Sequence, residues 1–236
     1  MKKTFYLVVI VLSLFSCKKE NHEDPYLKES GTFKDSRDGH SYQWVKIGNQ
    51  IWMAENLAYL PKVSSPSKKS ETEAYYYVYG YENYILDAAL KSENYIKYGA
   101  LYNYPAALSA SPDGWHLPTD DDWEQLAQYV SEQSGGCTKH DDDWFGVGKH
   151  LRTITGWPYA WSNEIGTDDY GFSALPGGYR FPDGSFLNEG GSGYWWSSNV
   201  MNASDAWSRR MSDGDNGFFR VYFGKDDCLS IRCIKD

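Results

Sequence analysis

The chain has 236 residues and a formal net charge of −9, with 32 acidic against 23 basic side chains. This acidity argues against nucleic acid and against anionic lipid as partners. Aromatic residues make up 17% of the chain, including 20 tyrosines and 10 tryptophans, which is typical of β-rich folds with long loops and suits surfaces that bind carbohydrate or protein.

The N-terminus has the pattern of an export signal. Two lysines precede an apolar run over residues 5–15, which is too short to span a bilayer. The run ends in Leu14-Phe15-Ser16-Cys17, which resembles a lipobox, so residues 1–17 are predicted to be a lipoprotein signal peptide with Cys17 lipidated. The alternative is an ordinary signal peptide cut near Ser16. Acyl chains on Cys17 would anchor the protein firmly, since each buried methylene contributes about 0.8 kcal/mol.

Residues 18–30 are polar, lack a core pattern and are predicted to be a flexible tether. Their lysine followed by Glu20, Glu23 and Asp24 resembles surface-export tethers of some Gram-negative lipoproteins. We therefore expect an outer-membrane lipoprotein, exposed on the cell surface and attached to the membrane by its lipid. No Pro/Gly linker divides the rest of the chain, so residues 31–236 are predicted to form one domain.

The first half of this domain predicts a hairpin and short helices. Residues 40–47 alternate in polarity, positions 48–49 are a Gly-Asn turn, and residues 50–53 return, which indicates a β-hairpin. The tyrosine-rich stretch 75–84 is interpreted as an insertion over the surface, followed by a short helical pattern over 84–90. Residues 101–110 predict a short helix with Pro105 in its first turn.

The clearest predicted helix begins after Thr119, a favourable N-cap that is followed by three aspartates in the first turn. Apolar side chains recur at helical spacing and should face the core: Trp123, Leu126, Ala127 and Val130. Gly135 and Gly136 end the helix. Beyond position 171 the pattern changes to short strands near residues 171–180, 184–188, 193–199, 204–211, 217–224 and 228–235.

Several motifs of the second half occur in a characteristic order. They are Gly114-Trp115-His116-Leu117-Pro118-Thr119, Asp121-Asp122-Trp123-Glu124, the Gly-Phe-Ser-Ala-Leu-Pro-Gly-Gly-Tyr-Arg run at 171–180, Tyr194-Trp195-Trp196-Ser197-Ser198 and Ser230-Ile231-Arg232-Cys233 with the three residues after it. This series resembles the Fibrobacter succinogenes major paralogous domain family. Residues 31–35 and 52–57 fit the start of that family, so the resemblance spans about 31 to 236. It leaves the activity open.

The helix-entry and terminal motifs are also similar to those of formylglycine-generating enzymes, which have a C-type-lectin-like fold. The resemblance therefore implies an α+β domain with a twisted antiparallel sheet, one or two helices, long loops and neighbouring chain ends. The catalytic cysteine pair of those enzymes has no counterpart here, because no cysteine lies between Cys137 and Cys228. No Gly-x-Ser-x-Gly elbow and no zinc spacing occurs either, and His116 is interpreted as a packed, hydrogen-bonded ring at the helix entry.

Two ligand sites are candidates. Tyr76, Tyr79, Trp157 and Trp161 are candidate ring platforms for a glycan or a protein, although the alternation around 157–161 equally fits a half-buried strand. Asp213 and Asp215 alternate in a Gly/Asn-rich turn and are candidate calcium ligands, with a plain β-turn as the alternative. No other cofactor is indicated. Paired acids elsewhere fit a glycan-processing enzyme only remotely.

The remaining cysteines predict one disulfide, because exported proteins keep such bonds. Members of the family often carry a cysteine just before the Gly-Trp-His motif that resembles the partner of the final-strand cysteine. Here that stretch reads Ser109-Ala110-Ser111-Pro112-Asp113, which leaves Cys233 without its usual partner. We expect Cys137–Cys228, with Cys233 a buried free thiol. The rival pairing is Cys137–Cys233, and three free thiols are the remaining alternative.

These observations favour a surface-anchored, non-catalytic binding module for glycan or protein ligands. The alternative is a structural or assembly component of the envelope or of an appendage.

Overall fold

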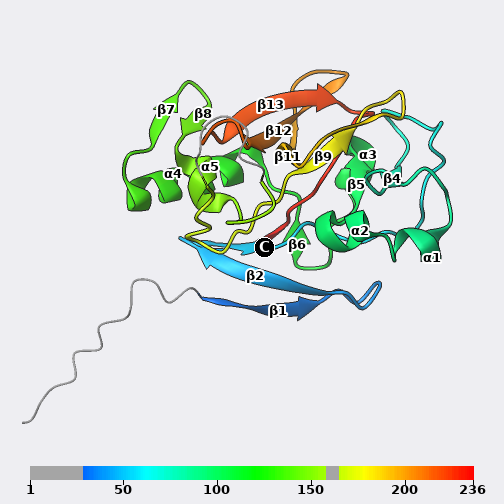
Figure 1. Cartoon of the computed structure of the whole chain (residues 1–236), viewed down its shortest axis with the longest axis horizontal. Helices are drawn as coiled ribbons and strands as arrows, with labels where there is room; N and C mark the ends of the chain where they lie inside the picture. The colour runs from blue at the N-terminus through cyan, green and yellow to red at the C-terminus, as the bar shows by residue number, and fades with distance from the viewer. Residues whose placement is uncertain (1–28, 158–164) are drawn as a thin grey trace, which may run out of the picture.

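The structure, a computed structural model, describes residues 29–157 and 165–236, and it is an α+β fold with two main sheets. The smaller sheet has the strand order β1-β2-β3-β15-β6, and all its pairings are antiparallel. Its strands are β1 (Ser30–Lys34), β2 (Ser41–Ile47), β3 (Gln50–Met53), β15 (Ile234–Lys235) and β6 (Trp115–His116). The first and last strands of the described chain therefore share one sheet, at the bottom of Figure 1.

The larger sheet has the order β13-β12-β11-β9-β14-β5-β4, and β10 pairs with β9. Among the described strands of this sheet, β11 and β9 pair in parallel and the other neighbours are antiparallel. Its strands are β4 (Tyr76–Tyr77), β5 (Leu101–Asn103), β9 (Gly177–Arg180), β10 (Phe186–Glu189), β11 (Ser192–Val200), β12 (Asp205–Ser212), β13 (Phe219–Gly224) and β14 (Cys228–Leu229). A separate hairpin joins β7 (Thr138–His140) to β8 (Asp143–Phe145).

The helices are few and short, apart from α4. They are α1 (Leu86–Ala89), α2 (Glu93–Tyr98), α3 (Tyr104–Ala107), α4 (Asp120–Ser134) and α5 (Val147–Leu151). The predicted start of α4 is confirmed: Thr119 Oγ1 accepts from the Asp122 amide at 3.1 Å, and the Asp122 carboxylate accepts from the Thr119 amide at 2.9 Å. This capping box satisfies two amides that lack helical partners. None of the described helices combines the length and apolar character needed to cross a membrane.

The predicted core face of α4 is fully buried against the β2–β3 hairpin, α5 and β11. Trp123, Leu126, Ala127 and Val130 are each 0% exposed, and Trp123 packs on Trp52 with 4.6 Å between ring centroids. The predicted hairpin is also confirmed, since Val45 pairs with Trp52 across it.

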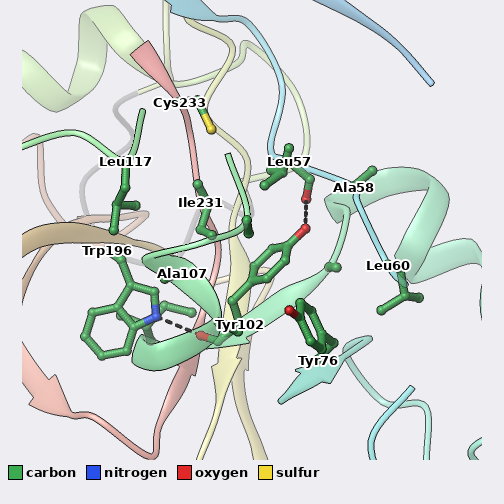
Figure 2. Packing of buried hydrophobic residues seen from close by; sticks show 14 of the residues in the cluster. Leu57, Ala58, Leu60, Tyr76, Tyr102, Ala107, Leu117, Trp196, Ile231 and Cys233 are labelled. Atoms are coloured by element: carbon green, nitrogen blue, oxygen red, sulfur yellow. Dashed lines mark hydrogen bonds between the residues drawn. The ribbon is translucent and has the colours of Figure 1, made fainter. Parts of the chain in front are cut away.

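Residues 76–78 of the tyrosine-rich segment are part of the core, which corrects the predicted surface insertion for this part of it. Tyr76 lies edge-on to Tyr102, with 5.8 Å between the ring centroids, and β4 pairs with β5. The Tyr102 hydroxyl donates to the Leu57 carbonyl at 3.1 Å, and the Trp196 indole donates to the Tyr102 carbonyl at 2.7 Å (Figure 2). A dense run of rings in the sequence does not show whether a strand will be buried. Here the strand pairs with β5 inside the larger sheet, and both of its tyrosines are buried.

The single strand expected over 228–235 is two strands in different sheets. β14 joins the larger sheet and β15 the smaller one, so residues 230–233 cross between the sheets. Residues 228–234 are all buried, and a segment buried on both sides shows no alternation that would reveal the crossing.

Candidate functional site

A buried hydrogen-bonded centre between the two sheets joins four segments of the family resemblance, namely residues 52–57, 171–180, 194–198 and 230–236. Its hub is Asn56, which is 7% exposed and follows β3. The Asn56 Oδ1 atom accepts from the Trp195 indole at 2.8 Å and from the Arg232 guanidinium at 2.9 Å. Its Nδ2 atom donates to the Tyr98 carbonyl at 3.0 Å and to Ser230 Oγ at 3.3 Å. One amide therefore joins β3, α2, β11 and the crossing segment.

Arg232 is the charged member of this centre and is fully buried. Its guanidinium donates to the carbonyls of Phe172 and Ser173, and it lies over the Phe172 ring at 4.5 Å. Burial lowers the pKa of Arg232 to about 9, while Asp168 and Glu55 oppose this shift. The cation therefore remains charged near neutrality and holds the turn that carries the 171–180 motif.

That turn is conformationally strained and borders a cavity. Asp168 and Ser173 both have positive φ, 48° and 55°, a conformation that non-glycine residues rarely adopt. The Asp168 carboxylate stabilises it by accepting from the Ser173 amide at 2.8 Å and the Ser173 hydroxyl at 2.7 Å. Asn56 and Ser173 both line a cavity of about 240 Å³, so the motif residues form its floor.

A second, wider hollow of about 480 Å³ adjoins this cavity, because His40 and Tyr95 line both. We call the two together the Tyr95 groove. It runs between the β1–β2 turn and helices α1 and α2, which lie at the same end of the molecule (Figure 1). The residues that line it include Arg37, His40, Glu55, Tyr59, Leu86, Leu90 and Ile96.

Two pairs of oppositely charged groups lie at the groove. Arg37 binds Asp35 through both carboxylate oxygens, with a closest distance of 2.6 Å. Burial alone would raise the pKa of Asp35, but the hydrogen bonds from Arg37 outweigh it and lower that pKa. The Arg37 guanidinium also lies 3.8 Å from the centre of the Tyr59 ring. His40 Nε2 is 3.8 Å from the Glu55 carboxylate.

The predicted ligand-binding aromatics do not form one site. Tyr76 is a core residue at 9% exposure. Tyr79 is half-buried and packs on Phe186 in another cluster. The half-buried Trp157 donates to the Ala174 carbonyl at 3.1 Å and to Thr153 Oγ1 at 3.2 Å; because Thr153 lines the deeper cavity, Trp157 lies beside the Tyr95 groove. The remaining candidate, at position 161, lies outside the described residues.

The predicted calcium turn is engaged in protein contacts. Asp215 accepts from Ser212 Oγ at 2.8 Å and from the Gly217 amide at 2.9 Å, and it lies 3.5 Å from the Arg210 guanidinium. The Asp213 amide donates to the Gly191 carbonyl at 2.9 Å. Among the described residues, no group of three or more His, Cys, Asp or Glu side chains is placed to hold a metal ion. These contacts fit the β-turn interpretation.

The predicted Cys137–Cys228 disulfide is not formed, and all three described cysteines are free thiols. Cys137 packs beside the cluster around α4, whereas Cys228 belongs to the cluster with Tyr77 and Leu101. The expectation of a buried free Cys233 is confirmed, since this thiol is 0% exposed. Its Sγ atom lies 3.4 Å from Ser111 Oγ, within the stretch where the family resemblance places the missing partner.

The interpretation of His116 as a hydrogen-bonded ring at the helix entry agrees with the structure. Its Nδ1 atom lies 2.7 Å from the Asp236 carboxylate, and its Nε2 atom lies 3.5 Å from Asp122 in the capping box. The ring thereby joins the C-terminus to the start of α4.

The residues of the groove were missed by sequence reasoning because they come from separate parts of the chain. Tyr59 and Tyr95 are single rings in segments without a strong pattern. The sequence feature that could have indicated the groove is the 84–96 segment. Large apolar residues occur there next to charged ones, as they do on an exposed surface that contacts a ligand.

Comparison with curated proteins and with solved structures gave no match. The sequence model of the Fibrobacter succinogenes major domain matches residues 45–235. The match covers the larger sheet, the smaller sheet from the end of β2 onward, the described helices and the motifs that meet at Asn56 and Arg232. The chain therefore belongs to the Fibrobacter succinogenes major domain family.

Proposed function

We propose that this chain is the non-catalytic binding module of a surface-anchored outer-membrane lipoprotein, and that it holds a glycan or protein ligand in the Tyr95 groove. The lipid anchor is Cys17, and residues 18–30 tether the domain to the membrane. The observation that supports this best is the groove itself, an aromatic-lined hollow beside a buried centre built from the family motifs. Concave, largely apolar sites with a few polar groups are typical of ligand binding.

A non-catalytic role is supported by what the motif residues do. Trp195 and Arg232 are buried and both donate to Asn56, so the polar groups of this centre are engaged with one another and support the groove. We further propose that the domain has the C-type-lectin-like arrangement. Two features support this: β1 and β15 lie in one sheet, and α4 begins directly after the helix-entry motif.

One observation favours the second candidate, a structural or assembly role in the envelope. Four large apolar side chains are exposed within a short segment around α1 and α2: Tyr84 at 74%, Ile85 at 59%, Leu90 at 37% and Ile96 at 74%. Contiguous exposed apolar surface is typical of protein contacts. This role also places the contact at the rim of the Tyr95 groove, since Leu90 and Ile96 line it.

A ligand screen on the purified protein tests the proposal. The wild-type chain, the groove variant Tyr59→Ala and the remote variant Tyr222→Ala are screened on a glycan array and against a library of displayed short peptides. Tyr222 is 55% exposed on β13, so its ring is a matched control outside the groove. We expect ligands that bind wild type and Tyr222→Ala but are lost with Tyr59→Ala. Ligands that bind all three equally would place the site elsewhere.

A further inference from the structure

The smaller sheet ends in an open strand. β1 stands at one end of its strand order and pairs with β2 along its whole length, and it lies at the outer edge of the molecule (Figure 1). At the two ends of this pair, the Lys46 amide donates to the Glu29 carbonyl and the Asp35 amide donates to the His40 carbonyl, both at 2.8 Å. Successive residues of an antiparallel strand alternate between bonding to the partner strand and facing away from it. The odd-numbered residues of β1 therefore bond to β2, and the even-numbered ones turn their amides and carbonyls outward.

The outward-facing residues of β1 are Ser30, Thr32 and Lys34. In the described part of the chain, no other segment hydrogen-bonds to their outward amides and carbonyls. The strand also lacks the features that protect natural edge strands, because it has no proline and no bulge, and its one charged side chain stands at its end. An unpaired edge of this kind is a template for a further strand.

The other ends of the two main sheets are closed or short. At β13, the Arg220 amide donates to the Asp143 carboxylate and the Gly224 amide donates to the Asp227 carboxylate, both at 2.9 Å. These carboxylates occupy the positions that a further strand would need. β4 and β6 are each two residues long, which leaves little length for pairing. Among these sheet ends, β1 is therefore the one that can accept a strand.

A second copy of β1 fits this edge by symmetry. In an antiparallel pair centred on Thr32, this residue lies opposite its own counterpart, and Ser30 lies opposite Lys34. All the outward-facing residues then meet at the hydrogen-bonded positions of the ladder. Gly31 lies opposite Phe33 of the other copy, at a position where side chains approach most closely. An aromatic ring opposite an edge glycine fills the space that the glycine leaves.

Charge favours the antiparallel arrangement over a parallel one. A parallel pair in register would set Lys34 opposite Lys34, and like charges directly opposite each other are destabilising. In the antiparallel pair, each exposed Lys34 lies opposite an uncharged serine and one position away from the exposed Glu29 of the other copy. The strand is therefore complementary to itself in one direction only.

We infer that two copies of this chain join through their β1 strands, in an antiparallel pair about a two-fold axis at Thr32 that continues the smaller sheet from one copy into the other. The same patch is used on both copies, as two-fold symmetry requires. This strand does not line the Tyr95 groove, so the inference goes beyond the proposed function and does not depend on it. Such a dimer carries two grooves, and a repetitive ligand would bind it with greater avidity.

Sedimentation velocity of the purified full chain, over a range of concentrations, measures self-association of wild type, Thr32→Pro and Thr32→Val. Proline has no amide hydrogen, and because the Thr32 amide faces away from β2, the β1–β2 ladder tolerates the change. Thr32→Val is the matched control, since it keeps the amide and the branched shape. We expect a dimer for wild type and Thr32→Val, at least about tenfold weaker dimerisation for Thr32→Pro, and similar Tm values in all three.

Crosslinking tests the register without disturbing the ladder. Thr32→Cys and Ser30→Cys, both at exposed positions, are treated with a short bismaleimide in a Cys137→Ser background, because Cys137 is the most accessible of the described thiols. We expect covalent dimers from Thr32→Cys and few from Ser30→Cys, which lies opposite Lys34. A monomeric wild type, including one that retains a different protein at β1, would overturn the inference. So would a dimer that persists unchanged in Thr32→Pro, or equal crosslinking at both positions.

Discussion

Replacing Ser111 with cysteine should create a disulfide with Cys233. The Ser111 hydroxyl lies 3.4 Å from the Cys233 thiol, and Ser111 is half-buried while Cys233 is fully buried. A sulfur at position 111 would therefore already be next to its partner in the folded protein. Cys233 otherwise remains a free thiol whose pKa burial raises to about 12, so in the wild type it is protonated and unreactive at neutral pH.

The size of the effect follows from the length of the loop that the bond closes. Positions 111 and 233 are 122 residues apart, and in the chain-entropy description a crosslink over such a loop stabilises the folded state by about 5 kcal/mol. For a domain of this size each kcal/mol raises Tm by about 2–4 °C. The oxidised variant should thus melt ~10–20 °C above its reduced form.

The assay is thermal and urea unfolding of Ser111→Cys with and without reductant, together with mapping of disulfide-linked peptides. Ser109→Cys is the matched control, because position 109 is exposed on the same stretch and its thiol should stay free. The double variant Ser111→Cys/Cys233→Ser should lose the reductant-sensitive gain. A Ser111→Cys chain with unpaired thiols after oxidation, or one whose Tm does not change on reduction, would refute the placement of the crossing segment.

Three further results are expected. Burial raises the pKa of Asp227 to about 7, so the folded state keeps a proton that the unfolded chain releases above about pH 4. The free energy of unfolding should therefore fall by on the order of 2–4 kcal/mol between pH 4 and 7. In Asp227→Asn, the free energy from urea unfolding should depend less on pH over the same range. Asn56→Ala leaves the buried Trp195 indole and Arg232 guanidinium without their shared acceptor, and it should lower the free energy of unfolding by about 3 kcal/mol; a change below about 0.5 kcal/mol would contradict this. Cys17→Ala should move the protein from the detergent to the aqueous phase on phase separation, whereas identical partitioning would argue against lipidation.

The parts of the fold with a strong local pattern were predictable. Helix α4 has its start at Thr119, its buried face and its end at Gly135 as the sequence indicates. Strands β11, β12 and β13 lie where turn residues separate short apolar runs. In both cases the determinant is local, namely a cap, a turn or a period, and needs no knowledge of what packs against the element.

The remaining features depend on contacts between distant segments. The core position of Tyr76 requires β5, and the division of the last predicted strand requires both sheets. The free thiols at Cys137 and Cys228 reflect their location in separate clusters, which sequence spacing does not encode. The Tyr95 groove is the extreme case, because at least five separate segments line it, and those around Arg37 and Tyr95 carry no motif.

Whether the Tyr95 groove is the binding site can be decided by locating the bound ligand on the surface with two point variants. The measurement is the affinity of the strongest ligand from the glycan and peptide screens for wild type, Leu90→Asp and Tyr222→Ala. Both replaced side chains are exposed, at 37% and 55%, and each change removes a large apolar side chain from a different place on the surface. We predict that Leu90→Asp weakens binding by at least about tenfold and that Tyr222→Ala leaves it within about twofold of wild type. Unchanged affinity in Leu90→Asp with a loss in Tyr222→Ala would contradict the account and move the site to the β12–β13 face.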